Sequence, residues 1–315
     1  MRKIASLLLV FVISLCLSSC TDSGMESSAK NDSQSAAADT KQTTEKTQIE
    51  TTVPAAETTV SITETSAAAL IDILSTITSK NYPVVDGSTA TIPLAIGLIQ
   101  KITGCTEAQA EESIAFNTTD ASYKAMADGK SQLLLVYEPA QPTIDTLNVF
   151  KTLDMRPIGL DALVFIVNED NPVDSLTSDQ IRGIYSGDIT NWSEVGGEDK
   201  EIVAFQRPEL SGSQTLMLNL MMKGTPMVTP EKELISAGMA DIIEDISAYN
   251  NSADAIGYSV YYYAKNMYTQ PGLKFISVDG VLPSNETINS QEYGFTNPFY
   301  GVIPLDPTPE AKAIL

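Results

Sequence analysis

An arginine followed four residues later by a Ser-Gly-Ser turn is the part of this sequence best suited to chemistry. Arg207 precedes Ser211, Gly212 and Ser213, and a glycine between two hydroxyls lets the backbone come close to a ligand. The turn follows a predicted strand over 201–206 and opens a predicted helix, where unpaired N–H groups and the helix dipole attract anions. Arginine adds a charged, two-pronged contact. The pattern predicts an oxyanion site, although an ordinary helix cap beside a surface arginine fits it too.

Two further predicted helix starts carry hydroxyl groups. Ser88 and Thr89 precede a helix that begins at Pro93, and Thr118 and Thr119 precede another helix. Each turn alone is also a normal N-cap. The chain contains no histidine, which excludes Ser-His-Asp and Cys-His catalysis and histidine zinc sites. We therefore predict a pocket of hydrogen-bond donors that binds an anion without reacting on it, with no metal and no cofactor.

The elements that must position these turns alternate along the chain. Apolar strands are predicted over 82–85, 132–137, 162–167 and 201–206, and helices over 70–74, 93–101, 121–128 and 215–224. Apolar strands separated by short helices indicate parallel sheets covered on both faces, the α/β class. In such sheets ligands bind beyond the carboxyl ends of the strands, where the three turns fall.

The N-terminus is typical of an exported protein. Residues 1–19 combine a short basic start with an apolar run too short to span a membrane, and we interpret them as a signal peptide. The sequence around Cys20 resembles the bacterial lipobox, which implies a lipid on that cysteine; a plain signal peptide with an incidental cysteine is the alternative. Residues 20–65 are rich in Ser, Thr and Ala and predict a disordered tether.

Several segments, taken in order, resemble the phosphate-binding proteins of bacterial phosphate ABC transporters. The resembling segments are 87–93, 184–192, Arg207 with 211–213, 255–258 and 278–284. The resemblance implies an α/β, two-lobed, periplasmic-binding-protein-like (type II) fold with a hinge that closes on its ligand. It also implies that 66–160 and 259–315 form lobe I and 161–258 form lobe II, with crossings near Ala162 and Gly257.

The resemblance also implies a set of ligand-binding residues. The implied phosphate ligands are Ser88, Thr89, Ala90, Thr118, Glu138, Arg207, Ser211, Gly212 and Ser213. Glu138 stands where the family has an aspartate that accepts the proton of hydrogen phosphate, and a solvated strand-end residue is the alternative. The family's glycine-rich second loop is replaced by Asn117-Thr118-Thr119, which leaves open which threonine contacts the ligand.

The implied function is capture of inorganic phosphate for the permease subunits of an ABC importer. The protein would be a monomer and not an enzyme, held by its lipid on the extracytoplasmic face of the cell membrane. The alternatives are another oxyanion, or a surface sensing or adhesion protein on the same scaffold. The chain has 40 acidic and 19 basic residues and a formal charge of −21, which argues firmly against nucleic acid as a partner. Because salt screens exposed charges beyond ~8 Å, local donors would decide anion binding.

Overall fold

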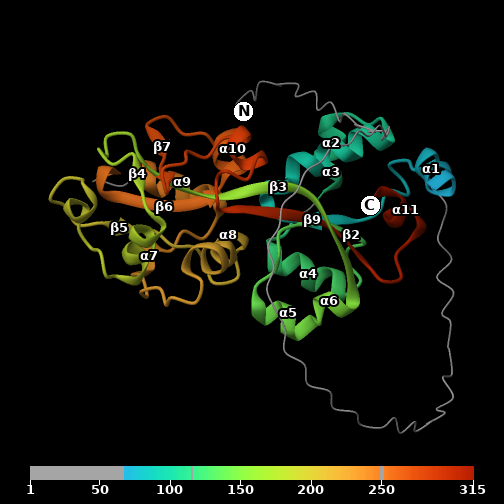
Figure 1. The fold of residues 1–315 in the computed structure, drawn as a ribbon. Coiled ribbons are helices and arrows are strands. Elements are labelled where there is room, and N and C mark those ends of the chain that lie inside the picture. Colours follow the sequence, from blue (N-terminus) through green and yellow to red (C-terminus); the bar gives the residue numbers. More distant parts are fainter. Residues whose placement is uncertain (1–66, 115, 249–251) are drawn as a thin grey trace, which may run out of the picture. The chain divides into compact units, whose positions relative to one another are not determined.

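The computed structural model describes residues 67–114, 116–248 and 252–315 (Figure 1). The predicted signal peptide, Cys20 and the tether over 20–65 therefore lie outside the described residues. Within the described part the chain forms an α/β fold with two lobes, as predicted.

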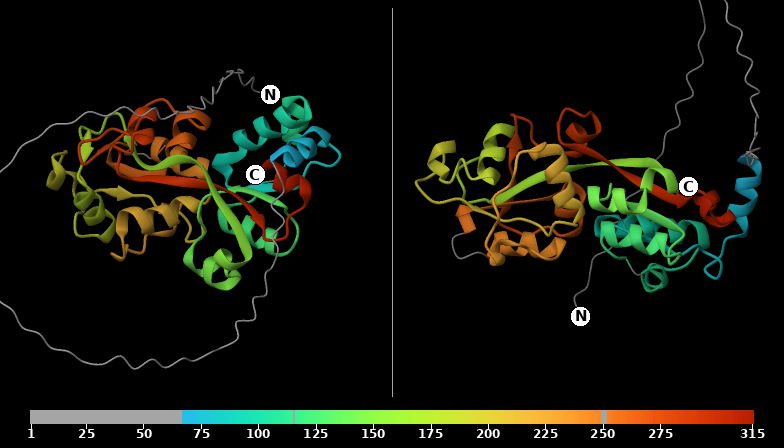
Figure 2. Two further views of the ribbon diagram at one scale, coloured as in Figure 1. Left: turned by 45° about the vertical axis from the view of Figure 1, so that its right-hand side comes forward. Right: turned by 90° about the horizontal axis from the view of Figure 1, so that it is seen from below.

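Two long strands connect the lobes. β3 (Leu153–Asn168) pairs antiparallel with β9 (Thr296–Pro304) over the whole length of β9, and both run between the two groups of helices (Figure 1). Figure 2 shows the same pair from two further directions. Beyond Ala162, β3 changes partner and pairs with β6 (Ala255–Val260). Among the described strands, β3 and β9 are the ones that run from one lobe to the other, which is where a hinge between the lobes is expected.

The first lobe is built on β1 (Val85–Gly87) and β2 (Leu133–Val136), which lie beside β9 in the order β1-β2-β9-β3. Its helices are α1 (Ala67–Thr76), α2 (Ile92–Thr103), α3 (Glu107–Ser113), α4 (Thr119–Ala127), α5 (Gln141–Leu147), α6 (Val149–Thr152) and α11 (Pro309–Ile314). Alternate residues of β2 enter two separate cores, because side chains on a strand alternate between faces: Leu135 packs under α2, and Leu134 packs under α4 with Tyr123.

The second lobe surrounds the C-terminal half of β3. Its strands are β4 (Ser175–Leu176), β5 (Val203–Ala204), β6, β7 (Leu273–Phe275) and β8 (Ser277–Val278), and its helices are α7 (Ser178–Ser186), α8 (Gly212–Leu216), α9 (Met239–Ala248) and α10 (Asn285–Asn289). Residues 217–222 continue α8 as a π-helix. Phe165, Tyr185 and Tyr258 are buried together at the centre of this lobe.

The sheet differs from the prediction in direction. Among the strands of the described residues, only the pairs β1–β2, β5–β6 and β4–β8 are parallel, whereas β9 is antiparallel to both β2 and β3. The physical reason is that β3 carries the chain from the first lobe to the second and β9 carries it back. The sheets are therefore mixed, where the sequence predicted parallel ones, and the α/β class is as predicted.

The pairing of the late strands also differs from the predicted division at residue 259. β7 pairs with β3, and β8 pairs with β4, so residues 273–278 accompany the second lobe. β6, which holds Gly257, lies within the second lobe's sheet. The return between lobes is made by β9, about 40 residues after Gly257 (296 against 257).

Candidate functional site

The three turns singled out in the sequence meet at one place. Ser88 Oγ, at the end of β1, lies 2.8 Å from Thr119 Oγ1 at the start of α4. Gly212, at the start of α8, lies against the same threonine: a Cβ built on Gly212 would be 2.5 Å from Thr119 Oγ1. Two loops of the first lobe and one of the second therefore contact one another, although 31 residues separate Ser88 from Thr119 and far more separate either from Gly212.

The Ser88 turn is held tightly on β2. Gly87 carries no side chain because a Cβ there would lie 1.9 Å from the carbonyl oxygen of Leu135. Ser88 N–H donates to that carbonyl at 3.1 Å, and Thr91 Oγ1 donates to it at 2.6 Å. Ser88 Oγ also accepts the N–H of Tyr137 at 3.2 Å. These bonds fix the Ser88 hydroxyl at the carboxyl end of the sheet.

The second turn is tied to β1 by Asp86. One carboxylate oxygen of Asp86 accepts the backbone N–H of Asn117 at 2.8 Å, and the other accepts its side-chain amide at 2.5 Å. This bond pair places the start of α4 beside Ser88. Thr119 is buried there, whereas Thr118 is exposed and its side chain does not cap the helix. Of the two threonines that the sequence left open, the structure brings Thr119 to the other turns.

The third turn carries a buried arginine. Arg207 is only 7% exposed, and its Nε donates to Ser213 Oγ at 3.3 Å. Its Nη1 donates to the carbonyl of Ser236 at 2.6 Å and to that of Gly238. Burial lowers the pKa of Arg207, although nearby acidic groups oppose the shift. Ser211 caps α8 by accepting Gln214 N–H at 3.2 Å, so its hydroxyl is partly used.

Several donors around this contact are free. Among the described residues, no acceptor bonds the backbone N–H groups of Thr89, Ala90, Gly212 and Ser213, nor Nη2 of Arg207. Buried N–H groups without acceptors are costly, so these groups are expected to bind a ligand or water. Donors with a nearby guanidinium and several hydroxyls suit a small oxyanion.

Glu138 lies two residues beyond the end of β2 and is half-buried. Its charge acts on Tyr123 and Tyr300, and Tyr123 is one helical turn after Thr119 on α4. Partial burial raises the pKa of Glu138. No hydrogen bond joins its carboxylate to Ser88, Thr119 or Arg207 within the described part of the chain. Its chain neighbour Tyr137 bonds Ser88 Oγ through its N–H, and the role of Glu138 as a ligand stays a prediction.

Sequence reasoning did not find the buried pair of Tyr137 and Asp161. Tyr137 OH donates to Asp161 Oδ2 at 2.7 Å, and Asp161 Oδ1 accepts the N–H of Tyr262 at 3.0 Å. Tyr137 also borders Gly212: a Cβ there would be 3.8 Å from its ring. Burial raises the pKa of Asp161, and the bonds it accepts oppose the rise. An aspartate placed directly before the apolar run 162–167 was the available signal.

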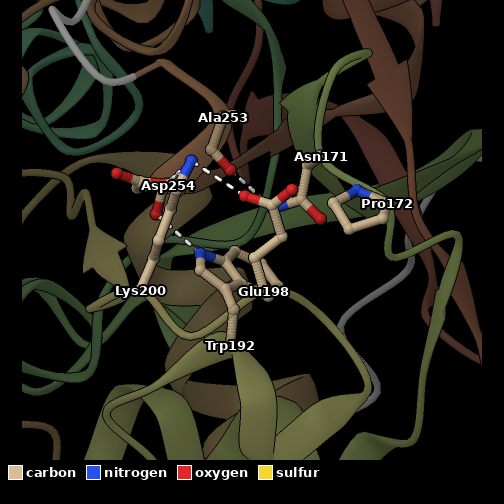
Figure 3. Close-up of a pocket in the computed structure, with 7 residues that line it drawn as sticks. All are labelled: Asn171, Pro172, Trp192, Glu198, Lys200, Ala253 and Asp254. Carbon is tan, nitrogen blue, oxygen red and sulfur yellow. Dashed lines mark hydrogen bonds and ion pairs between the residues drawn. The ribbon is translucent and has the colours of Figure 1, made fainter.

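A small surface pocket lies elsewhere in the second lobe. It is lined by Asn171, Pro172, Trp192, Glu198, Lys200, Ala253 and Asp254 (Figure 3). Its polar groups bond one another: Lys200 Nζ lies 3.0 Å from Glu198, and Trp192 Nε1 donates to the carbonyl of Asp254 at 2.9 Å. Because these groups already have partners, we interpret the pocket as structural.

Within residues 67–114, 116–248 and 252–315, no group of three or more His, Cys, Asp or Glu residues is arranged to hold a metal ion. No helix in the same ranges has the length and apolar character needed to cross a membrane.

The chain is similar to curated proteins named phosphate-binding protein PstS. Over 218 residues the chain is 26% identical to the phosphate-binding protein PstS of Bacillus subtilis, covering 66% of this chain and 65% of that one. Over 138 residues it is 33% identical to the PstS of Borreliella burgdorferi, covering 42% and 48%. The chain thus spans about half to two thirds of the length of these curated relatives.

A solved structure is also similar. It is the crystal structure of a putative phosphate ABC transporter substrate-binding protein with bound phosphate from Clostridium perfringens, with 26% identity and a TM-score of 0.58. The match covers 73% of this chain and 90% of that one, so the expected two-lobed fold is confirmed. The family model described as "PBP superfamily domain" matches residues 78–314, which is most of the chain. The chain is therefore a member of the PBP superfamily, the periplasmic-binding-protein-like proteins.

Proposed function

We propose that this protein captures inorganic phosphate and delivers it to the permease of an ABC importer. The observation that carries the proposal is the meeting of Ser88, Thr119 and Gly212 near the buried Arg207. Free N–H groups and a guanidinium are donors only, and a doubly charged oxyanion can satisfy several of them at once. The chain has no histidine to act as a base, so the proposed activity is binding without turnover.

The relatives support phosphate as the ligand. The curated relatives are named phosphate-binding proteins, and the Clostridium perfringens protein was crystallised with phosphate bound. An importer would use the protein as a monomer whose lobes close on the ion about β3 and β9. An exported protein with a lipid on Cys20 would hold the binding lobes near its permease, and a Cys20→Ser variant should then leave the membrane fraction.

Glu138 is the proposed discriminator between phosphate and sulfate. At neutral pH only phosphate brings a proton to donate, so a carboxylate facing the ligand would accept from phosphate and repel sulfate. A site that leaves buried polar groups unpaired with the wrong ligand discriminates strongly.

Competition tests this proposal. Phosphate binding is measured for the parent and for Glu138→Gln, each with sulfate in large excess. We expect sulfate to compete poorly with phosphate in the parent and better in the variant. If sulfate competes as well in the parent as in the variant, Glu138 does not discriminate between the two ions. Strong competition by sulfate in the parent would also weaken the proposal that phosphate is the natural ligand.

A further inference from the structure

We propose that Asp241 and Asp245, two carboxylates on α9, fix the position of the Arg207 guanidinium from behind the anion site. They are positioning residues, because they act through the arginine and the loop that holds it. The inference deepens the proposed function and rests on it for the identity of the ligand.

The Arg207 side chain is held in place through its guanidinium. Its Nη1 donates to two backbone carbonyls, those of Ser236 and Gly238, and its Nε donates to Ser213 Oγ. These three bonds, from two of its nitrogens, fix the orientation of the planar guanidinium. Nη2 remains without a partner among the described residues, and it is the group left to bind an anion.

The loop over 236–238 is held by two carboxylates of α9. Gly238 N–H donates to Asp241 Oδ2 at 2.6 Å, and Ser236 Oγ donates to Asp245 Oδ2 at 2.6 Å. Asp241 and Asp245 are four residues apart on α9 and so share one face of that helix. A Cβ on Gly238 would lie 2.9 Å from Asp241 Oδ2, which shows how closely the loop sits on this carboxylate.

The loop is also joined to the strand that leads into Arg207. Ser236 N–H donates to the carbonyl of Gln206 at 3.0 Å, and Gln206 N–H donates to that of Leu234 at 2.9 Å. The loop's backbone is thus fixed on one side by the residue before Arg207 and on the other by α9. Removing an α9 carboxylate would loosen the second side and release the carbonyls that hold Nη1.

If Asp241 and Asp245 position the loop, removing one should change phosphate affinity in the opposite direction from a purely electrostatic effect. No ion pair joins Arg207 to Asp241 or Asp245 within the described ranges, but both carboxylates act on its charge. Negative charges near a bound anion repel it, so removing one should tighten phosphate binding if charge alone matters. If the carboxylates hold the loop, removing one should weaken binding instead.

The test compares Asp241→Ala with Asp241→Asn by calorimetric titration with inorganic phosphate. Both changes remove the charge, but asparagine keeps an oxygen that can accept Gly238 N–H. We expect about three- to tenfold weaker binding for Asp241→Ala, the effect of one lost hydrogen bond, and binding within about twofold of the parent for Asp241→Asn. Asp245→Ala should behave like Asp241→Ala. Tighter or unchanged binding in Asp241→Ala, or equal weakening by both Asp241 changes, would overturn the inference.

Glu233→Ala is the matched control, because Glu233 is an exposed carboxylate of the same segment with no hydrogen bond to the loop. It should bind phosphate like the parent. Asp241→Ala in an Arg207→Ala background gives a second control. In that background the loss of Asp241 should change phosphate affinity little further. A further three- to tenfold loss of affinity would show that Asp241 does not act through Arg207.

A readout without phosphate separates this inference from the proposed function. The chain has only four arginines, so the Nε–H signal of Arg207 can be assigned in NMR spectra of the ligand-free protein by an Arg207→Lys variant. We expect slow solvent exchange of this proton in the parent and Glu233→Ala, and faster exchange in Asp241→Ala. Failure of the parent to bind phosphate would contradict the proposed function alone, whereas unchanged exchange in Asp241→Ala would contradict the positioning role.

Discussion

Gly212 of the second lobe lies directly against Thr119 of the first, so closely that a Cβ at position 212 would be 2.5 Å from Thr119 Oγ1. Thr119 Oγ1 in turn lies 2.8 Å from Ser88 Oγ. The proposed site is thus a contact between lobes, and the glycine is required by space at this contact. A ligand bound there would touch both lobes, which is how binding can be coupled to closure about β3 and β9.

Gly212→Ala should weaken phosphate binding about tenfold, because the added methyl group must push Thr119 or the loop aside. Gly97→Ala is the matched control: Gly97 is an exposed position inside α2, and a Cβ there has no neighbour within 4 Å. It should bind normally and raise the free energy of unfolding by about 0.5–1 kcal/mol. Calorimetry and denaturant unfolding measure both quantities, and normal binding by Gly212→Ala would contradict the close contact.

Thr119→Val and Thr118→Val should differ, although the residues are neighbours of the same type. Thr119→Val removes a buried hydroxyl that bonds Ser88, and we expect about 1 kcal/mol lower stability and weaker phosphate binding. Thr118 is exposed and its side chain does not cap α4, so Thr118→Val should change neither quantity much. The reverse order of effects in phosphate titrations would return the ligand role to Thr118.

The limits of sequence reasoning are visible at these threonines. The helix start was predicted at Ala121 and lies at Thr119, and this shift of two residues decides which hydroxyl is buried. Where a strong local signal bounded an element, prediction succeeded: Pro93 lies near the start of α2, where the sequence placed it. Gly104, with a φ of 71°, ends that helix.

Features that depend on contacts between distant parts of the chain could not be predicted from the sequence. Residues 153–161 contain Asp154, Arg156 and Pro157 and have no strand pattern, yet they form β3 because β9 provides a partner. The carbonyls that hold Arg207 come from Ser236 and Gly238, about 30 residues later. Arg207 and the Ser-Gly-Ser turn were predictable because their chemistry lies within seven consecutive residues.

Tyr137→Phe should lower the free energy of unfolding by about 1–3 kcal/mol, because it removes a hydrogen bond to the buried Asp161 carboxylate. Tyr262→Phe is the control, since Tyr262 is 38% exposed and only its backbone N–H contacts Asp161. Urea unfolding of both variants checks the prediction. Similar stability of the two variants would show that the Tyr137 hydroxyl contributes little.

The raised pKa of Glu138 predicts a pH dependence of stability. Burial disfavours the charged form, so the folded protein holds this proton to a higher pH than the unfolded chain does. The resulting stability is fully present below the ordinary glutamate value of about 4.3 and is lost as pH rises through the raised value. Glu138→Gln should lack this component when unfolding is measured from about pH 4 to 7. A parent and variant with parallel pH profiles would mean that Glu138 is solvated.

Calorimetric titration of inorganic phosphate into the parent and Arg207→Ala tests the central claim most directly. Arg207 is buried, and leaving its charged hydrogen bonds unmade is costly. We predict saturable binding of one phosphate by the parent and a loss of about 2–4 kcal/mol of binding free energy in the variant. Absence of binding by the parent, or equal affinity in Arg207→Ala, would contradict the account.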